Sequence, residues 1–382
     1  MEHARACAWI DLDAVAANLA AMKEKLKSET RMIAVIKTDA YGHGAVPIAR
    51  MTESCDYLWG FAVATVEEAM QLREAGIRKP ILILGFVFPE DYDTIVRNQL
   101  RIALFKYSMA CALEEAARKA GVKALVHLAV DTGMARIGFP VSEEGAREAA
   151  KAARLEHLIV EGTFTHFSRA DEEDKAFTHL QYDRFLAFEG MLRSLGVDPG
   201  MRHAANSAGI MELSGYQLDA VRAGITIYGI YPSEEVDRSN LPLKSVMSLT
   251  SHISYIKELP EGCPISYGGT FVTKRKSLIA TVPVGYGDGY PRLLSNKGEV
   301  LIRGKRAPIV GRVCMDQFMV DVTEIEAEEY DLVTLLGRDG SEEITVEELG
   351  RISGRFPYEF TCDINERVPR EYLRSGAQPP RG

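Results

Sequence analysis

A lysine stands at the end of a short apolar run near the start of the chain. Lys37 follows Met32–Ile36 and precedes a turn that contains Asp39, Gly42 and Gly44. Such a run is typical of a buried strand, and desolvation at its end can lower the pKa of an amine so that it attacks an aldehyde and forms a Schiff base. The alternative is an ordinary salt-bridged lysine, which is the commoner state of this residue.

Two later segments are rich in small residues and could bind an anion. His203–Gly209 has the sequence HAANSAG, and Arg222–Ile225 has the sequence RAGI. Small side chains leave backbone N–H groups open to a phosphate, to which the Ser207 hydroxyl could add a hydrogen bond. Asn206 and Ser207 could also begin a helix, and the two roles are compatible. A phosphate site together with a reactive lysine fits a phosphorylated aldehyde such as pyridoxal phosphate.

Two more polar side chains follow predicted strands. His166 comes directly after Leu158–Thr165, where its ring could stack on an aromatic cofactor or occupy the core. For His166 taken alone, the core position is favoured. Arg136 lies in Asp131–Gly138, where its guanidinium could hold a carboxylate by paired hydrogen bonds or form a structural ion pair.

The C-terminal part of the chain contains tyrosines among glycines. Tyr267 lies in SYGG, Tyr286 in GYGDGY, and Met315 in VCMD. Segments of this kind are usually turns, but a phenol can also exchange protons. The glycines around Tyr286 do not form G-x-G-x-x-G and do not open a helix, so no dinucleotide site is indicated.

The elements that must position these residues alternate regularly between residues 10 and 235. Short runs rich in Val, Ile and Leu alternate with stretches of helical spacing, one of which begins with a capping box from Thr65 to Glu68. Eight such β/α units predict a closed (β/α)₈ TIM-type barrel, whose active site lies at the carboxyl ends of the strands. The predicted strands are Met32–Lys37, Trp59–Val63, Ile81–Gly85, Arg101–Phe105, Leu125–Asp131, Leu158–Thr165, Arg202–Asn206 and Asp219–Ile225.

After Pro232 the pattern changes to strand-like runs separated by turn residues. We therefore expect a cofactor-binding barrel at residues 10–235 and a β-rich C-terminal domain at residues 236–382, which the first few N-terminal residues join. A capping box between Thr345 and Glu348 predicts one short helix in this domain. The predicted strands are His252–Leu259, Ser277–Pro283, Glu299–Ile302, Pro308–Val313, Phe318–Val322 and Leu332–Leu336.

The composition is that of an ordinary globular protein with a negative charge. The 382 residues include 45 Lys and Arg and 54 Asp and Glu, a formal charge of −9, so nucleic acid is not an expected partner. The six cysteines form no C-x-x-C pair, and we expect neither a metal site nor disulfides. Neither an apolar run of the roughly 20 residues that cross a bilayer nor a secretory signal is present, so we expect a cytoplasmic protein with no membrane partner.

In their order along the chain, these motifs resemble those of the bacterial alanine racemases, fold-type III pyridoxal-phosphate enzymes with a barrel and a C-terminal β domain. Lys37–Gly44 (KTDAYGHG) is similar to the cofactor-lysine motif of that family. The resemblance covers nearly the whole chain. It implies a homodimer that interconverts L-alanine and D-alanine and so supplies D-alanine for cell-wall peptidoglycan. The other matching segments are Asp131–Gly138, Thr165–Glu172, His203–Gly209 and Val221–Gly229.

The resemblance also implies a role for each candidate site residue in the barrel. Lys37 would carry the cofactor, His166 would lie against its pyridine ring, and Arg222 would donate a hydrogen bond to the ring nitrogen. Arg136 would hold the cofactor phenolate and the substrate carboxylate. The other implied cofactor-binding residues are Tyr41, Ser207, Gly224 and Ile225 around the phosphate, together with Asn206.

Inversion at the α-carbon needs two acid/base groups on opposite faces of the substrate. The resemblance implies Lys37 as one group and Tyr267, supplied across a dimer interface, as the other. Met315 and Tyr286, also from the partner, would bind the substrate. A phenol with a reference pKa near 10 needs neighbouring donors to act at neutral pH.

Two positions depart from the family pattern. Ala129 stands where the resemblance implies a lysine that supports Arg136, and Glu366 stands where it implies a tyrosine at the cofactor phosphate. A carboxylate would turn away from the phosphate and leave more room beside the substrate, so serine or another small amino acid is an alternative substrate.

A non-catalytic carrier of the cofactor would not need the domain that contains Tyr267. A decarboxylase of the same barrel type is a third alternative, against which the order of the tyrosine and methionine motifs favours racemisation.

Overall fold

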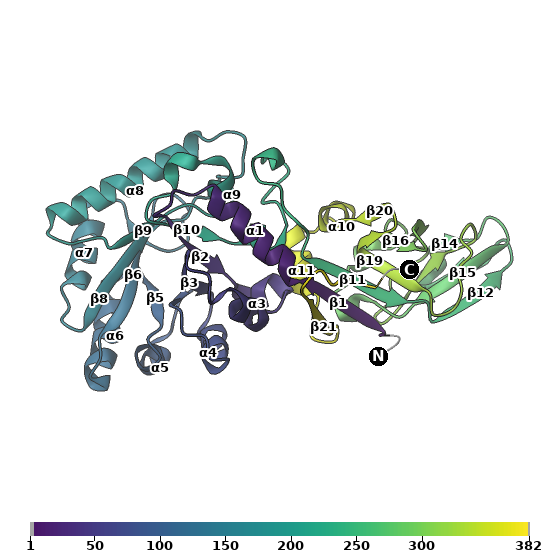
Figure 1. Cartoon of the computed structure of the whole chain (residues 1–382), viewed down its shortest axis with the longest axis horizontal. Coiled ribbons are helices and arrows are strands. Elements are labelled where there is room, and N and C mark those ends of the chain that lie inside the picture. The colour runs from purple at the N-terminus through teal and green to yellow at the C-terminus, as the bar shows by residue number, and fades with distance from the viewer. Residues whose placement is uncertain (1–3, 381–382) are drawn as a thin grey trace.

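The computed structural model describes residues 4–380 and has two lobes placed end to end (Figure 1). One lobe is a barrel of alternating strands and helices, and the other is built mainly from strands. Residues 1–3 and 381–382, which belong to the two ends of the predicted C-terminal domain, lie outside the described residues. Within residues 4–380, no helix is both long enough and apolar enough to span a membrane.

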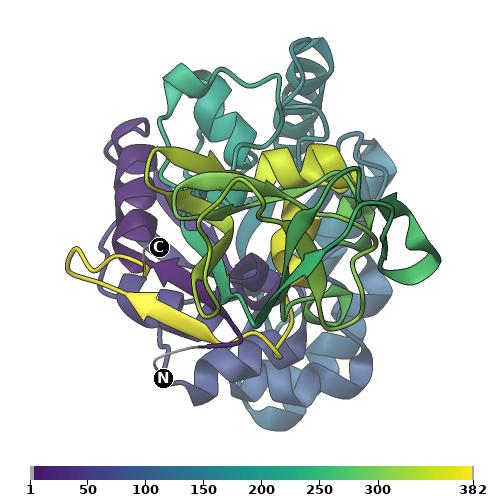
Figure 2. The same cartoon turned by 90° about the vertical axis from the view of Figure 1, so that its right-hand side faces the viewer.

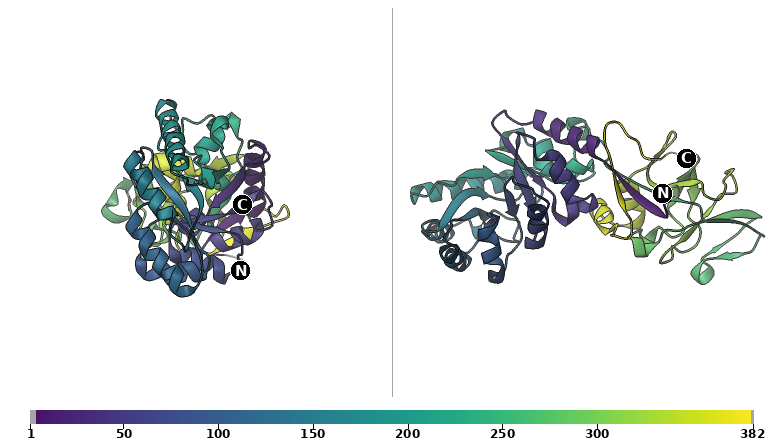
Figure 3. Two further views of the ribbon diagram at one scale, coloured as in Figure 1. Left: turned by 90° about the vertical axis from the view of Figure 1, so that its left-hand side faces the viewer. Right: turned by 60° about the horizontal axis from the view of Figure 1, so that its bottom comes forward.

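Eight parallel strands form a closed sheet in the first lobe, which confirms the predicted (β/α)₈ barrel. Their order is β5-β4-β3-β2-β10-β9-β8-β6, and the pairing of β5 with β6 closes the circle. Figure 3 shows this lobe from its free end, with the helices around the strands. The strands are β2 (Arg31–Val35), β3 (Leu58–Val63), β4 (Ile81–Ile83), β5 (Arg101–Leu104), β6 (Ala124–Asp131), β8 (Leu158–Phe164), β9 (Met201–His203) and β10 (Ala220–Ala223), and the short β7 (Phe139–Pro140) pairs with β6.

Some helices of the barrel begin at a residue whose side chain caps them. Asp11 accepts a hydrogen bond from the Ala14 N–H and so starts the first helix. The capping box predicted between Thr65 and Glu68 is confirmed. The helical elements are α1 (Leu12–Glu24), α2 (Lys37–Gly42), α3 (Ala45–Thr52), α4 (Val66–Glu74), α5 (Tyr92–Arg97), α6 (Tyr107–Ala120), α7 (Glu143–Ala153), α8 (Ala176–Ser194) and α9 (Ser207–Glu212).

The second lobe contains a seven-stranded sheet whose path is β17-β16-β19-β11-β1-β21, with β20 paired to β19. The first strand of the chain, β1 (Ala6–Asp11), lies inside this sheet, antiparallel to β11 and parallel to β21. Figure 2 shows the lobe in front of the barrel. The strands are β11 (Met247–His252), β16 (Glu299–Ile302), β17 (Lys305–Pro308), β19 (Leu332–Asp339), β20 (Glu342–Ile344) and β21 (Arg370–Leu373), with β12 (Tyr255–Leu259), β15 (Ser277–Val282) and β18 (Phe318–Asp321) in a second sheet and β13 (Pro264–Ile265) and β14 (Phe271–Val272) in a third.

The predictions for two strands of this lobe are corrected. The strand predicted at Pro308–Val313 ends where it was expected to begin, because β17 forms a hairpin with β16 and Gly311 has a φ of 81°. The predicted His252–Leu259 is divided between β11 and β12.

The predicted short helix is α10 (Val346–Ser353), and a second helix that was not predicted, α11 (Pro357–Asp363), follows it. The Thr345 side chain caps α10 by accepting from the Glu348 N–H. The Glu348 carboxylate does not close the capping box but binds Arg306 at 2.7 Å, because an ion pair with a guanidinium is a stronger interaction than a bond to a neutral N–H.

Candidate active site

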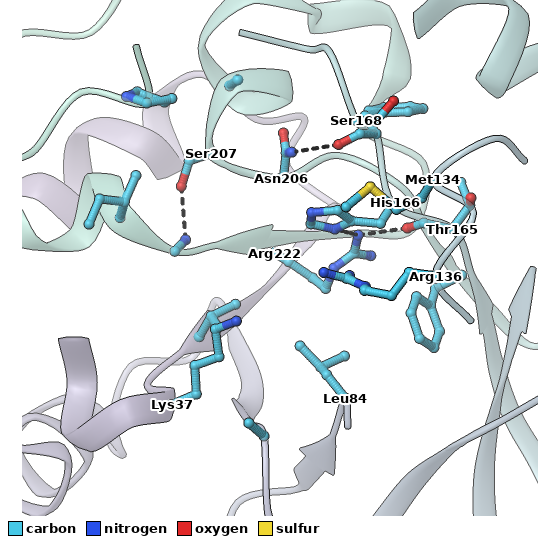
Figure 4. A pocket seen from close by; sticks show the side chains of 18 of the residues that line it. Lys37, Leu84, Met134, Arg136, Thr165, His166, Ser168, Asn206, Ser207 and Arg222 are labelled. Carbon is cyan, nitrogen blue, oxygen red and sulfur yellow. Dashed lines mark hydrogen bonds between the residues drawn. The ribbon is translucent and has the colours of Figure 1, made fainter. Parts of the chain in front are cut away.

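A cavity of about 580 Å³ lies at the carboxyl ends of the barrel strands. Every barrel residue predicted for the site lines it, although these residues are spread over nearly 190 positions of the sequence. Figure 4 shows the side chains that converge there. The predicted residues of the second lobe, Tyr267, Tyr286 and Met315, do not line it. The predicted residues that do are Lys37, Tyr41, Arg136, His166, Asn206, Ser207, Arg222, Gly224 and Ile225.

Lys37 is positioned by a left-handed turn. It is the first residue of α2, and the next four residues, Thr38–Tyr41, have φ values between 49° and 54°, which L-residues rarely adopt in succession. The Thr38 N–H donates to Glu68 Oε1 at 2.6 Å, and the Ala40 N–H donates to the Ile36 carbonyl at 2.9 Å. This turn directs the Lys37 side chain into the cavity (Figure 4).

The surroundings of Lys37 favour its neutral form. Burial lowers the pKa of the ammonium group, the positive charge of Arg136 lowers it further, and the negative charge of Glu68 partly opposes both effects. Within residues 4–380 Lys37 forms no ion pair. A neutral amine attacks aldehydes and accepts protons, so the site favours a reactive lysine over an ordinary salt-bridged one.

Arg222 is fully buried without a carboxylate partner, and its charge is compensated by neutral acceptors. Its terminal nitrogens donate to the carbonyls of Thr165 and Ala204 at 2.6 and 3.0 Å, to His203 Nδ1 at 2.7 Å and to His166 Nδ1 at 3.2 Å. Burial and the nearby charge of Arg136 lower the pKa of Arg222 to about 9, so the group stays protonated at neutral pH. These bonds use only the terminal nitrogens and leave the Nε–H for a ligand that can accept a hydrogen bond.

A small cradle suited to an anion lies between α9 and β10. Ser207 Oγ accepts hydrogen bonds from the Gly224 N–H and the Thr226 hydroxyl, both at 3.0 Å. A hydroxyl has two acceptor positions and one proton, so the Ser207 proton is free for an oxygen of the ligand. A Cβ on Gly224 would lie 3.4 Å from Tyr41 Oη and 3.5 Å from Ser207 Oγ, and would fill this space. The neighbouring Asn206 caps α9 through its side chain, as predicted.

Arg136 extends from the loop after β6 and has no hydrogen-bond or ion-pair partner within residues 4–380. Ala129, which departs from the family pattern, is buried against Ala103 and Phe164 and offers Arg136 no polar group. The guanidinium is therefore available to a carboxylate or another anion that enters the cavity.

The predicted residues of the second lobe lie together on its surface. The Tyr286 N–H donates to the Cys314 carbonyl at 3.0 Å, and Ser266 Oγ lies 3.5 Å from Cys314 Sγ, which links the segments of all the predicted residues. Exposure is 71% for Tyr267, 53% for Met315 and 42% for Tyr286. Large side chains exposed in one group are typical of a surface that another molecule covers.

Sequence reasoning missed Tyr358 and misplaced Glu366. Tyr358, on α11, lines the cavity and packs edge-on against Tyr41, with 6.0 Å between the ring centroids. Glu366 instead lines a separate surface hollow beside Thr38 and Asp39, on the outside of the left-handed turn. The expectation that Glu366 widens the substrate space was therefore wrong. No motif marks Tyr358, and the only nearby signal is the proline that precedes it at the start of its helix.

The chain matches two family models that together cover most of its length. Residues 10–232 match the model described as "Alanine racemase, N-terminal domain", and residues 246–372 match "Alanine racemase, C-terminal domain". An alanine racemase of Desulforamulus reducens is 43% identical over 96% of this chain and 98% of its own length. Alanine racemase 1 of Clostridium acetobutylicum is 42% identical over 97% of this chain and 95% of its own length.

Solved structures give the same result. Alanine racemase of Clostridium difficile 630 superposes with a TM-score of 0.92 at 39% identity over 97% of this chain and 96% of that one. The Bacillus anthracis enzyme, described with bound L-Ala-P, has a TM-score of 0.92 at 38% identity over the same shares. The Bartonella henselae enzyme, described with covalently bound pyridoxal phosphate, has a TM-score of 0.85 at 27% identity over 97% of this chain and 100% of that one.

The barrel, the lysine at its mouth and these relatives define an amino-acid racemase, an enzyme of the isomerase class. The carrier and decarboxylase alternatives are thereby set aside. The chain belongs to the alanine racemase family.

Proposed function

We propose that this racemase interconverts L-alanine and D-alanine with pyridoxal 5′-phosphate and two proton-transfer residues, Lys37 and Tyr267 of the partner subunit. The observation that carries the proposal is that the barrel cavity holds Lys37 but not Tyr267, a residue that is 71% exposed on the other lobe. Inversion requires a proton to leave one face of the α-carbon and another to arrive at the opposite face. A homodimer in which each second lobe covers the partner's cavity supplies the missing group.

The cavity residues fit a phosphorylated pyridine aldehyde. Lys37 provides the amine that binds the aldehyde carbon, and Ser207 provides a free hydroxyl proton for the phosphate beside Gly224. His166 provides a flat ring, and Arg222 provides an Nε–H that donates to an unprotonated ring nitrogen. When bound, the cofactor withdraws electrons from the substrate and so acidifies the hydrogen on its α-carbon.

Lys37 and Tyr267 would transfer protons on opposite faces of the substrate's α-carbon. Lys37, whose pKa burial lowers, accepts the α-proton as a neutral amine. Tyr267 of the partner subunit donates its phenolic proton to the opposite face, and the two residues exchange roles in the reverse reaction. Arg136, which has no partner within the described residues, holds the substrate carboxylate, aided by Met315 and Tyr286 of the second subunit.

The biological role that we propose is the supply of D-alanine for peptidoglycan, in the cytoplasm. A small apolar pocket separates alanine from serine only modestly, because one added hydroxyl changes binding by a limited amount. Serine, or another small amino acid, is the alternative main or side substrate. With Glu366 outside the cavity and Tyr358 inside it, alanine is the substrate that the lining favours.

The rates of L-to-D conversion of alanine and serine, measured side by side with added pyridoxal phosphate, test this function. We expect alanine to react at least about tenfold faster than serine. If serine reacts as fast as alanine or faster, serine would replace alanine as the proposed main substrate. If neither amino acid is converted, the proposal would be overturned. Borohydride reduction followed by peptide mass spectrometry should find the cofactor on Lys37, with Lys37→Ala as the control.

A further inference from the structure

Below the cavity, a chain of polar side chains crosses the interior of the barrel. Arg222 of β10 contacts His203 of β9, with 2.7 Å between Nη1 and Nδ1, and His203 Nε2 lies 2.8 Å from His127 Nδ1 on β6. His127 Nε2 faces Glu161 Oε2 on β8 at 3.5 Å, and Arg101 of β5 binds the same carboxylate at 2.8 and 3.0 Å. The two imidazoles and the Arg222 guanidinium are completely or almost completely buried.

The hydrogen bonds of this chain can run in only one direction. Arg222 has no acceptor atom, so His203 Nδ1 must accept and the single proton of a neutral His203 must be on Nε2. His203 then donates to His127 Nδ1, and the proton of a neutral His127 must be on its Nε2. Burial lowers the pKa of both histidines, which keeps both rings neutral. The Nε2–H of His127 therefore points at Glu161.

The packing around the rings prevents them from exchanging their nitrogens by rotation. His203 stacks on Phe164 with 5.0 Å between centroids and 7° between planes. His127 packs edge-on against Trp59 and fills the space that a side chain at Gly162 would occupy, where a Cβ would lie 2.7 Å from Nδ1. The assignment of each ring nitrogen is therefore fixed by the fold.

Glu161 is suited to be the last acceptor of the chain. Burial alone would raise its pKa, but the neighbouring His127 ring and the two hydrogen bonds from Arg101 lower it to about 2, so the group is a carboxylate without a proton of its own. His127 Nε2 is buried and makes no closer polar contact than the 3.5 Å to Glu161 Oε2, so without this carboxylate nothing would compensate the Nε2–H. The other tautomer of His127 would place two protons between the histidines, and a matching change in His203 would turn a proton toward Arg222.

We propose that Glu161 is a positioning residue for the cofactor-facing guanidinium. It fixes the tautomers of His127 and His203 from the far end of the barrel and thereby holds Arg222 with its Nε–H toward the cavity. The effect on a cofactor rests on the function proposed above, whereas the tautomers are a property of the protein alone.

Neutron diffraction from crystals of the holoenzyme locates these protons directly. We expect a deuteron on Nε2 and none on Nδ1 in both His127 and His203, and none on Glu161. A deuteron on Nδ1 of either ring, or on both nitrogens of one ring, would overturn the inference. This result does not depend on which amino acid the enzyme converts, so its failure is distinct from a failure of the proposed function.

A matched set of variants separates the acceptor from the ion pair. Glu161→Gln keeps an acceptor oxygen, Glu161→Met removes it, and Arg101→Met removes the ion pair but leaves the carboxylate. We expect Glu161→Met to lower kcat about tenfold, the factor for one unpaired buried donor, and to shift the absorption maximum of bound pyridoxal phosphate. Glu161→Gln and Arg101→Met should keep kcat within about twofold and leave the spectrum unchanged.

The alternative is a purely structural role for the Glu161 and Arg101 pair. In that case Glu161→Met and Arg101→Met would lower the thermal unfolding temperature alike, and neither would change the spectrum of the bound cofactor. An unchanged spectrum in a folded Glu161→Met protein would overturn the proposal. If Glu161→Met does not fold, the proton positions in the unsubstituted protein still decide it.

Discussion

At the scale of single residues, the feature that matters most is a lysine whose charge is disfavoured by its position. Lys37 follows a strand buried inside the barrel, and the positively charged Arg136 faces the same cavity. Burial and this like charge act in the same direction on the ammonium group, and Glu68 only partly offsets them. The position of Lys37 therefore favours the neutral, reactive form of its amine.

The reactivity of Lys37 should depend on pH in a way that sets it apart from exposed lysines. Because its pKa is lowered from the ordinary 10.5, Lys37 loses its proton at a lower pH than a lysine with the ordinary pKa does. Reductive coupling of the cofactor-free chain to pyridoxal, followed over pH by peptide mass spectrometry, should give a midpoint for Lys37 below the ordinary lysine value of 10.5. A midpoint at or above 10.5 would contradict the prediction.

Glu161 should contribute to stability in a defined pH range. Its folded-state pKa of about 2 lies below the ordinary 4.5, so its stabilising effect is complete above pH 4.5 and is lost as the pH falls toward 2. Glu161→Gln should therefore be less stable than the unsubstituted protein at about pH 7, and the difference should shrink below pH 4.5. Urea unfolding at several pH values measures this difference, with Glu326→Gln as the surface control. A difference that is constant over pH would refute the prediction.

The residues that sequence reasoning placed correctly in the cavity share one property. Lys37, His166 and Arg222 each lie at or just beyond the end of a barrel strand, and a closed parallel barrel brings all such ends to one face. Tyr358 reaches the same cavity from α11, more than 300 residues after Lys37, and no periodic pattern reports that contact. The error at Glu366 has the same cause, since a motif without its three-dimensional context does not say which side of a turn it faces.

At the scale of elements, the left-handed turn α2 and the helix α11 depend on each other. Gly42 closes the turn with a φ of 83°, and a Cβ there would lie 2.0 Å from the Thr361 carbonyl oxygen. The close approach fixes the lysine-bearing turn against the second lobe. The strain of four consecutive left-handed residues, about 1–2 kcal/mol each, has to be offset by such packing.

Gly42→Ala should therefore destabilise the protein more than Gly→Ala does at another glycine with a positive φ. Gly76 has a φ of 89°, but a Cβ at this position would have no neighbouring atom within 4 Å, so Gly76→Ala is the matched control. Both substitutions should cost about 1 kcal/mol for the left-handed backbone, and Gly42→Ala about 1–3 kcal/mol more for the contact. Denaturant unfolding measures both, and equal losses would show that the contact with Thr361 carries no weight.

The elements of the two lobes differed in how well the sequence predicted them. Most residues of the barrel strands are buried, so most of these strands appear as largely apolar runs, and each of them was predicted to within a few residues. In the second lobe, β13 and β14 have two residues each, too few for any periodicity. β17 reads KRAP, and charged side chains of this kind do not indicate a strand. Its existence depends on the hairpin with β16.

At the scale of the whole molecule, each chain has Lys37 in the barrel cavity and Tyr267 on the surface of the second lobe, and Tyr267 does not line the cavity of its own chain. Mixed dimers test whether Lys37 of one chain and Tyr267 of the other form one active site. Lys37→Ala and Tyr267→Ala chains are each expected to be inactive, but their mixed dimer has one site with both residues intact. Random exchange of equal amounts should restore about one quarter of the activity per site, since half the dimers are mixed and half their sites are complete.

Subunit exchange must be verified independently, for example with differently tagged chains. A mixture of two Lys37→Ala preparations is the control and should stay inactive. Complete exchange without recovery of activity would show that Lys37 and Tyr267 do not act across an interface, and the homodimer with shared sites would be withdrawn.

The position of β1 also sets the order in which the molecule can be completed during translation. β1 leaves the ribosome before the other described strands, yet its neighbours β11 and β21 begin only at Met247 and Arg370. At 5–20 residues per second, synthesis from β1 to β21 takes about 20–70 s, and until it ends at least one edge of β1 lacks its native partner. An unpaired strand is a template for association with other chains. The barrel can close on the nascent chain, whereas the sheet of the second lobe is complete only after β21 has been synthesised.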